Sequence, residues 1–136
     1  MLPAAAWPLF APMPVADRRH GLDVARRLLA AGHDDPDLLA AALLHDVAKG
    51  DRLRLWHRVV GVLLEAFAPR SLARLASPDP RSWRHPLHLY LHHATLSADA
   101  ARAAGCSERT VAFIRGSAPA ADSALATALH LADEAS

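Results

Sequence analysis

The amino-acid sequence predicts an all-α protein, folded as a single compact domain of about six to seven helices. Hydrophobic residues make up 52% of the 136 residues but aromatic residues only 5%, so alanine, leucine and valine must supply most of the core. Alanine and leucine are strong helix formers, whereas strands prefer β-branched and aromatic residues. Apolar residues at helical spacing also alternate with proline, glycine and serine breaks. A chain of this length can bury a core of its own.

The first sixteen residues differ from the rest of the chain. They are apolar but contain four prolines and no basic n-region, which argues against a signal peptide. We expect a proline-interrupted arm over residues 1–16 that lies on the body or at a subunit contact. The helical domain itself is expected over residues 17–136.

Cap and stop residues predict the helices of this domain. Asp17 is the expected N-cap of the first helix, which ends near residue 31 with Gly32 as its stop. Asp34 or Asp35 is expected to cap the second helix, which should run to Lys49. The later helices are expected over residues 55–68, 71–76, 83–104 (beginning near Pro86), 108–115 after Ser107, and 120–134.

Charge and cysteine content limit the classes of partner. The net charge is only +1, which gives no reason to expect nucleic acid or an anionic membrane. Cys106 is the one cysteine, so the chain has no intrachain disulfide and no cysteine-based zinc site. No apolar run reaches the length of a membrane span. We therefore expect a cytoplasmic protein, and a homodimer is compatible with the sequence.

Residues 43–50, LLHDVAKG, place an imidazole and a carboxylate at the end of an apolar helical run. His45 and Asp46 are adjacent, and Lys49, the one lysine of the chain, follows. Polar groups are costly to bury unless they are paired, so this pair needs a partner, and a bound cation would be an economical one. The alternative is an ordinary helix C-terminus, with Lys49 near the dipole and His45 satisfied in the core. Asp46 argues against it, because a carboxylate is disfavoured in the last helical turn.

Two other helices carry residues of the same kind. His20 lies on the first helix, and Asp133 ends an apolar stripe in which Leu125, Leu129 and Asp133 are four residues apart. Residues at this spacing share one helix face. The alternatives are a surface histidine beside two arginines and an exposed charge near the C-terminus.

The helix expected over residues 83–104 holds four histidines within nine residues. Packing does not need so many histidines, so at least one of the four is expected to face the site formed around His45 and Asp46. His92 and His93 are two of the candidates. His88 and His92 are four apart and could form a two-histidine half-site, although the glutamate of a metalloprotease motif is absent. Arg52, Arg54 and Arg58 could form a cationic rim that binds phosphate, or could be solvated side chains with packed apolar stems.

His20, the pair His45-Asp46, and Asp133, in this order on helical segments, resemble the HD superfamily of metal-dependent phosphohydrolases. The contexts HGLDVA at residues 20–25 and LAD at 131–133 are also similar to that family. The resemblance covers about residues 15–136 and implies an HD-type helical domain in which these four residues bind one metal. It further implies that Lys49 holds the phosphate and that Asp46 also orients the attacking water.

The donor types agree with a divalent metal. Two imidazoles and two carboxylates suit Mn²⁺, Fe²⁺, Co²⁺, Ni²⁺ or Zn²⁺, whereas Mg²⁺ is less natural for nitrogen ligands. Members of the family with two metals carry further histidines. His92 or His93 could supply one of them, but Gly116-Ser117 stands where the other is expected. This difference favours a mononuclear centre.

Three functions are therefore compatible with the sequence. The leading prediction is a mononuclear, metal-dependent phosphohydrolase that acts on a nucleotide or another small phosphate ester through a metal-activated water. The second is a non-catalytic module on an HD scaffold that binds a nucleotide or a partner protein. The third is a helical interaction protein with incidental histidines.

Overall fold

The computed structural model describes residues 2–49 and 85–136, with the backbone alone for residues 85–91. These residues form helices and no strand, which confirms the predicted all-α class. The α-helices of this part are α1 (Trp7–Phe10), α2 (Val15–Ala30), α3 (Pro36–Leu44), α6 (His85–Ala103), α7 (Glu108–Arg115) and α8 (Ser123–Glu134), with the short 3₁₀ helices η1 (Ala4–Ala6) and η2 (Ala120–Asp122). The helices predicted over 55–68 and 71–76, together with Arg52, Arg54 and Arg58, lie outside the described residues.

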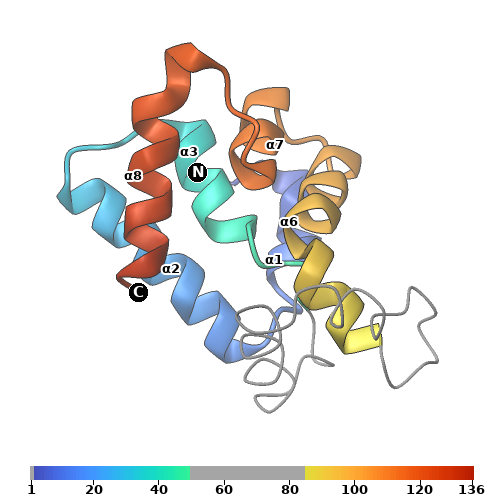
Figure 1. Ribbon diagram of the computed structural model, residues 1–136. Coiled ribbons are helices and arrows are strands. Elements are labelled where there is room, and N and C mark those ends of the chain that lie inside the picture. The colour runs from blue at the N-terminus through green and yellow to red at the C-terminus, as the bar shows by residue number, and fades with distance from the viewer. Residues whose placement is uncertain (1, 50–84) are drawn as a thin grey trace, which may run out of the picture.

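Helix α3 occupies the middle of the described fold (Figure 1). Helices α1, α2, α7 and α8 all pack against it. Every residue from Leu38 to Leu44 is buried, and a helix that is apolar on all sides is expected to be central. The residues that follow its C-terminus therefore lie in the interior of the fold.

The start of α2 corrects one prediction. Asp17 is not the N-cap, because the helix already begins at Val15, and Pro14 precedes it without a side-chain cap. The extended backbone of Pro14, with ψ 144°, turns the chain into the helix instead. Asp17 lies in the first turn, where a carboxylate interacts favourably with the helix dipole. The predicted stop is confirmed, since Gly32 adopts a φ of +86° directly after the helix.

The end of α3 corrects a second prediction. The α-helix ends at Leu44 rather than at Lys49, and the residues after it form turns. In a continued helix the amide of Ala48 would donate to the carbonyl of Leu44. It donates instead to Ser97 Oγ on α6, at 3.0 Å. This tertiary hydrogen bond replaces the helical one and shapes the turn that carries His45 and Asp46.

Other predicted caps are confirmed. Asp35 accepts hydrogen bonds from the amides of Asp37 and Leu38 at the start of α3. Ser107 caps α7, and Gly116 ends it in the left-handed conformation, with φ +75°. The helix predicted over 120–134 is divided into η2 and α8.

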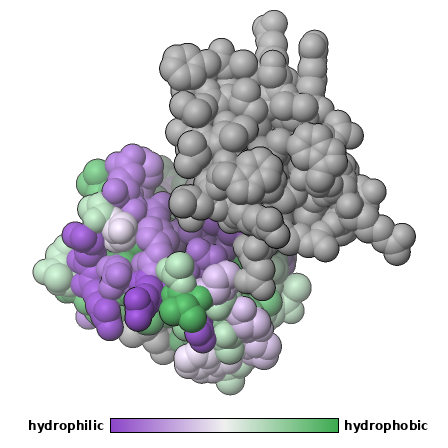
Figure 2. Space-filling view, turned by 90° about the horizontal axis from the view of Figure 1, so that it is seen from below, coloured by the Kyte–Doolittle hydropathy of each residue, from purple (hydrophilic) through white to green (hydrophobic). Residues whose placement is uncertain are grey.

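The N-terminal segment lies on the body, as one of the two alternatives predicted. It forms η1 and α1, and Ala6, Phe10 and Met13 are buried in the same core as α2 and α3. In Figure 2, the described part of the visible face is largely hydrophilic, with single hydrophobic residues between the polar ones. Within residues 2–49 and 85–136, no helix combines the length and apolarity needed to cross a bilayer.

Candidate metal centre

The interior end of α3 brings together four residues from three helices. His20 comes from α2, His45 and Asp46 follow α3, and Asp133 lies near the end of α8. Asp133 Oδ1 is 2.8 Å from His20 Nε2 and 3.1 Å from His45 Nε2. Asp46 Oδ2 is 3.9 Å and 3.6 Å from the same two nitrogens. Neighbouring ligand atoms around an ion at about 2.1 Å lie about 3.0–3.4 Å apart, so these separations, from 2.8 to 3.9 Å, are close to those around a bound ion.

A glycine lets α2 approach α3 closely enough to form this cluster. A Cβ atom added to Gly21 would lie 3.2 Å from the carbonyl oxygen of Ala42 and 3.3 Å from that of Leu43. Contacts this short are tighter than side chains normally accept, so the two backbones touch at Gly21. The neighbouring His20 is thereby held beside His45, and their rings meet edge to face at 5.2 Å between centroids.

The orientation of His45 leaves one ring nitrogen for a ligand. Nδ1 lies 2.9 Å from the carbonyl oxygen of Ala42, one turn earlier. A carbonyl can only accept, so Nδ1 carries the proton, and Nε2 of the neutral ring presents a lone pair to Asp133. Two acceptors at this distance need a cation between them, either a proton or a metal ion. A backbone carbonyl on the second nitrogen is also the usual way in which a metal-binding histidine is oriented.

The electrostatics of the described residues favour positive charge at this point. Burial alone would lower the pKa of His45, but the hydrogen bond to Asp133 and the charge of Asp46 outweigh it and raise that pKa. The hydrogen bond from His45 is also the main reason that the pKa of Asp133 is strongly lowered. A metal ion would take the place of the proton that this arrangement otherwise stabilises.

Asp46 is the most buried member of the cluster, with only 4% of its surface exposed. Its Oδ2 accepts a hydrogen bond from Lys49 Nζ at 2.7 Å. Its Oδ1 is buried and has no hydrogen-bond partner among the described residues. A buried carboxylate oxygen without a partner is costly, and a cation would satisfy it. The donor atoms of His20, His45 and Asp46 lie within 4.8 Å of one another, so this group could hold a metal ion.

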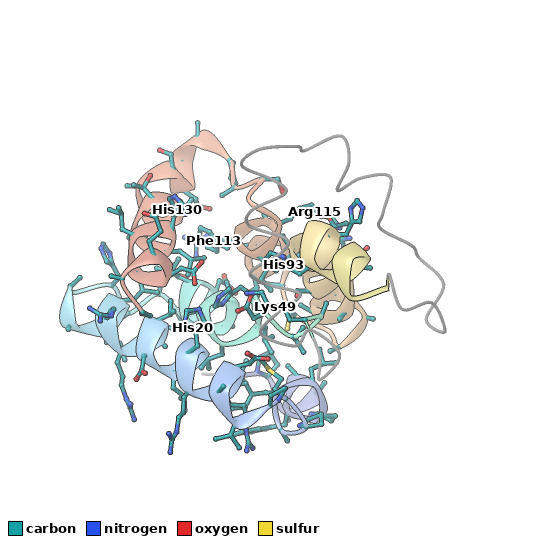
Figure 3. The ribbon with its side chains drawn as sticks, turned by 60° about the horizontal axis from the view of Figure 1, so that its bottom comes forward. His20, Lys49, His93, Phe113, Arg115 and His130 are labelled. Carbon is teal, nitrogen blue, oxygen red and sulfur yellow. The ribbon has the colours of Figure 1, made fainter. Side chains whose placement is uncertain are left out.

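The structure distinguishes between the two histidines left open on α6. His93 points into the site, with Nε2 at 3.8 Å from Asp46 Oδ1, whereas His92 is exposed. Figure 3 shows His20, Lys49 and His93 close together in the same part of the molecule. The side chain of His88 is not among those described, so the half-site of His88 and His92 stays a prediction.

The structure also adds residues that the sequence did not single out. Ser97 is fully buried and holds the turn after α3, yet a single serine in an alanine-rich helix carries no distinctive sequence signal. A cavity of about 510 Å³ opens beside the centre, and His45, His93 and Asp133 form part of its wall. Phe113 and Ile114 of α7 line it as well. Their apolar character predicts burial, but nothing in the sequence indicates that they face a cavity.

Comparison with known proteins found no match. No family model, no curated protein and no solved structure is significantly similar to the chain. Its function is therefore argued from the site.

Proposed function

We propose that the protein is a mononuclear, metal-dependent phosphohydrolase of the HD type that acts on a nucleotide or another small phosphate ester. The observation that carries the proposal is the buried Asp46 carboxylate, in which Oδ2 accepts a hydrogen bond from Lys49 and Oδ1 has no hydrogen-bond partner among the described residues. Two imidazole nitrogens and the Asp133 carboxylate face the same point. This mixed nitrogen and oxygen set suits Mn²⁺, Fe²⁺, Co²⁺, Ni²⁺ or Zn²⁺.

His20, His45, Asp46 and Asp133 would hold the metal. A bound divalent cation would lower the pKa of a water molecule and offset the negative charge on phosphorus. Lys49 has three N–H donors, of which one is used by Asp46, and the donors that have no acceptor among the described residues would serve phosphoryl oxygens. Asp46 would also orient the attacking water, as the resemblance to the HD family implies.

The test is metal content and phosphate release in matched variants. We expect about one metal ion per chain, and phosphate release from a panel of monoesters in the presence of Mn²⁺, Co²⁺ or Ni²⁺. Asp46→Asn and His45→Asn should weaken metal binding at least about 100-fold, since even outer-shell partners of a metal contribute about 10- to 100-fold. His33→Asn, thirteen residues beyond His20, serves as control and should behave as the wild type.

Two outcomes would contradict the proposal in different ways. Equal and low metal content in the wild type and both ligand variants would show that these residues do not bind a metal. Metal binding without phosphate release from any ester would instead support the non-catalytic HD-scaffold module.

A further inference from the structure

The cavity beside the metal centre is not needed to hold a phosphate group. It lies between α7 and α8, whose residues form most of its wall. Both helices pack on α3, but α7 also packs on α6 whereas α8 also packs on α2. One face of α8 lines it from Ser123 to Asp133. Ten residues of α-helix span about 15 Å, so the cavity extends well beyond the metal ligands.

The walls of the cavity are mainly apolar away from the metal. Phe113 and Ile114 of α7 face Ala126 and Leu129 of α8, and Ser123 and Thr127 add hydroxyl groups farther along. Within the described part of the lining there is no lysine, arginine or glutamate. The one carboxylate, Asp133, lies at the metal end. Away from the metal, the described wall offers a second phosphate or a carboxylate only the imidazole of His130 and the hydroxyls of Ser123 and Thr127. An apolar group would be in contact with most of the remaining wall, so it suits this end of the cavity better than a charge does.

Gly116 contributes to the length of the cavity. It ends α7 in the left-handed conformation and stands in the wall, and a Cβ added to it would meet nothing within 4 Å. The position at which the resemblance led us to expect a further metal-binding histidine is thus a bare backbone beside open space. Figure 3 shows Phe113 between His130 and His93 in the same region.

We propose that this cavity binds the organic part of the substrate, and that this part is an uncharged, elongated and largely apolar group whose phosphate lies at the metal. The inference rests on the proposed function, because the metal centre positions the phosphate. Its volume of about 510 Å³ is within the range of sites that enclose small molecules, about 300–1,000 Å³. Of the two substrate classes in the proposed function, the cavity therefore favours the small phosphate ester, as a phosphomonoester of an apolar alcohol, over the nucleotide.

Binding of alkylphosphonates tests this without relying on turnover. Calorimetry with the Mn²⁺-loaded full chain should give an affinity that rises from methyl- to butyl- to octylphosphonate, by about three- to fourfold per buried methylene. 3-Carboxypropylphosphonate, which has a charged end and a length close to that of butylphosphonate, should lose most of this gain. The kcat/KM values of the corresponding alkyl phosphates should rise in the same order.

A pair of variants on one helix supplies the control. Ala126→Leu narrows the cavity and should remove the dependence of affinity on chain length. Ala124→Leu is the matched control, because Ala124 lies on the same helix but is exposed. Unchanged thermal midpoints would show that both variants fold.

The outcomes separate this inference from the proposed function. If methyl phosphate is hydrolysed but chain length has no effect, the cavity assignment is wrong and the hydrolase proposal stands. If affinity rises with chain length and Ala126→Leu removes the rise, but no ester releases phosphate, the cavity assignment stands and the hydrolase proposal is wrong.

Discussion

At the scale of single residues, the centre depends on how the charge of Asp46 is balanced. The carboxylate is almost completely buried and ion-paired with Lys49, whose side chain is itself only 15% exposed. Attraction within a buried pair offsets much of the cost of removing each charge from water. If one partner is removed, that cost is left uncompensated.

Replacing Lys49 should therefore destabilise the metal-free protein. We expect Lys49→Met to lower the free energy of unfolding by about 3 kcal/mol in EDTA, the order observed when one partner of a buried pair is lost. Saturating Mn²⁺ should recover much of this loss, because the ion would balance the same carboxylate. Urea unfolding with and without metal measures both values.

Arg19→Met is the control for Lys49→Met, since Arg19 is exposed on α2 and its loss should change stability by less than about 0.5 kcal/mol. If Lys49→Met lowers the free energy of unfolding by the same amount with and without Mn²⁺, the lysine and the metal do not both interact with Asp46.

At the scale of elements, the contact between α2 and α3 decides whether His20 reaches the centre. Glycine inside a helix costs about 1 kcal/mol relative to alanine, yet Gly21 stands in the middle of α2. The approach of the Ala42 and Leu43 carbonyls explains this, because a Cβ at this position would lie 3.2–3.3 Å from their oxygens and the neighbouring backbone would have to give way. The separation of the two helices and the place of His20 in the candidate metal centre are therefore linked at one position.

Gly21→Val tests this link. The added side chain should push α2 from α3 and lower the free energy of unfolding by about 2 kcal/mol, as overpacking of a core does. Metal affinity should fall as well, because His20 would move with α2. Titration of the apoprotein with Mn²⁺ and urea unfolding provide the two readouts.

Ala16→Val is the control at an exposed position of the same helix, and it should leave metal affinity unchanged. Wild-type metal affinity in Gly21→Val would contradict the role of the close approach.

At the scale of the whole molecule, Arg109 joins α7 to two other parts of the chain. Its guanidinium donates two hydrogen bonds to Asp122, at 2.8 and 2.9 Å, and another to Asp35 at the start of α3. It also lies over the ring of Phe113 at 5.3 Å. Three of the four proposed ligands lie just after α3 or in α8. The hydrogen bonds of Arg109 therefore help to fix the positions of the helices around the site, although Arg109 itself is not part of it.

The network should make stability depend on pH. Burial alone would raise the pKa of Asp35, but the hydrogen bond from Arg109 and those from two backbone amides outweigh it and lower that pKa. The hydrogen bond from Arg109 also lowers the pKa of Asp122. Carboxyl groups with depressed folded-state pKa values stabilise the fold above their unfolded value of about 3.9 and lose this contribution as the pH falls.

Arg109→Leu should thus be less stable than the wild type at pH 6, and the difference should shrink below about pH 4. Urea unfolding at a series of pH values measures it. Arg26→Leu is the control, because its pair with Asp23 is exposed and contributes little. A difference between wild type and Arg109→Leu that stays constant down to pH 2 would show that packing on Phe113, and not charge, is responsible.

The helical class and most helix ends follow from local sequence. Asp35, Ser107, Gly32 and Gly116 act within a few residues of themselves, by accepting from nearby amides or by adopting a positive φ. Effects that act over so few residues can be predicted from the sequence. The same holds for the chemical type of the candidate ligands, because imidazoles and carboxylates in apolar helices need partners wherever the chain places them.

Contacts between distant segments decided the rest. The amide of Ala48 donates a hydrogen bond to Ser97, 49 residues away, instead of to the helical carbonyl of Leu44. Helix α3 accordingly ends at Leu44 and not at Lys49. His93 rather than His92 faces Asp46 because of how α6 packs. The cavity lined by α7 and α8 depends on how both helices pack on α3. None of these can be read from spacing, because the energy of a tertiary contact depends on residues that are neighbours only after folding.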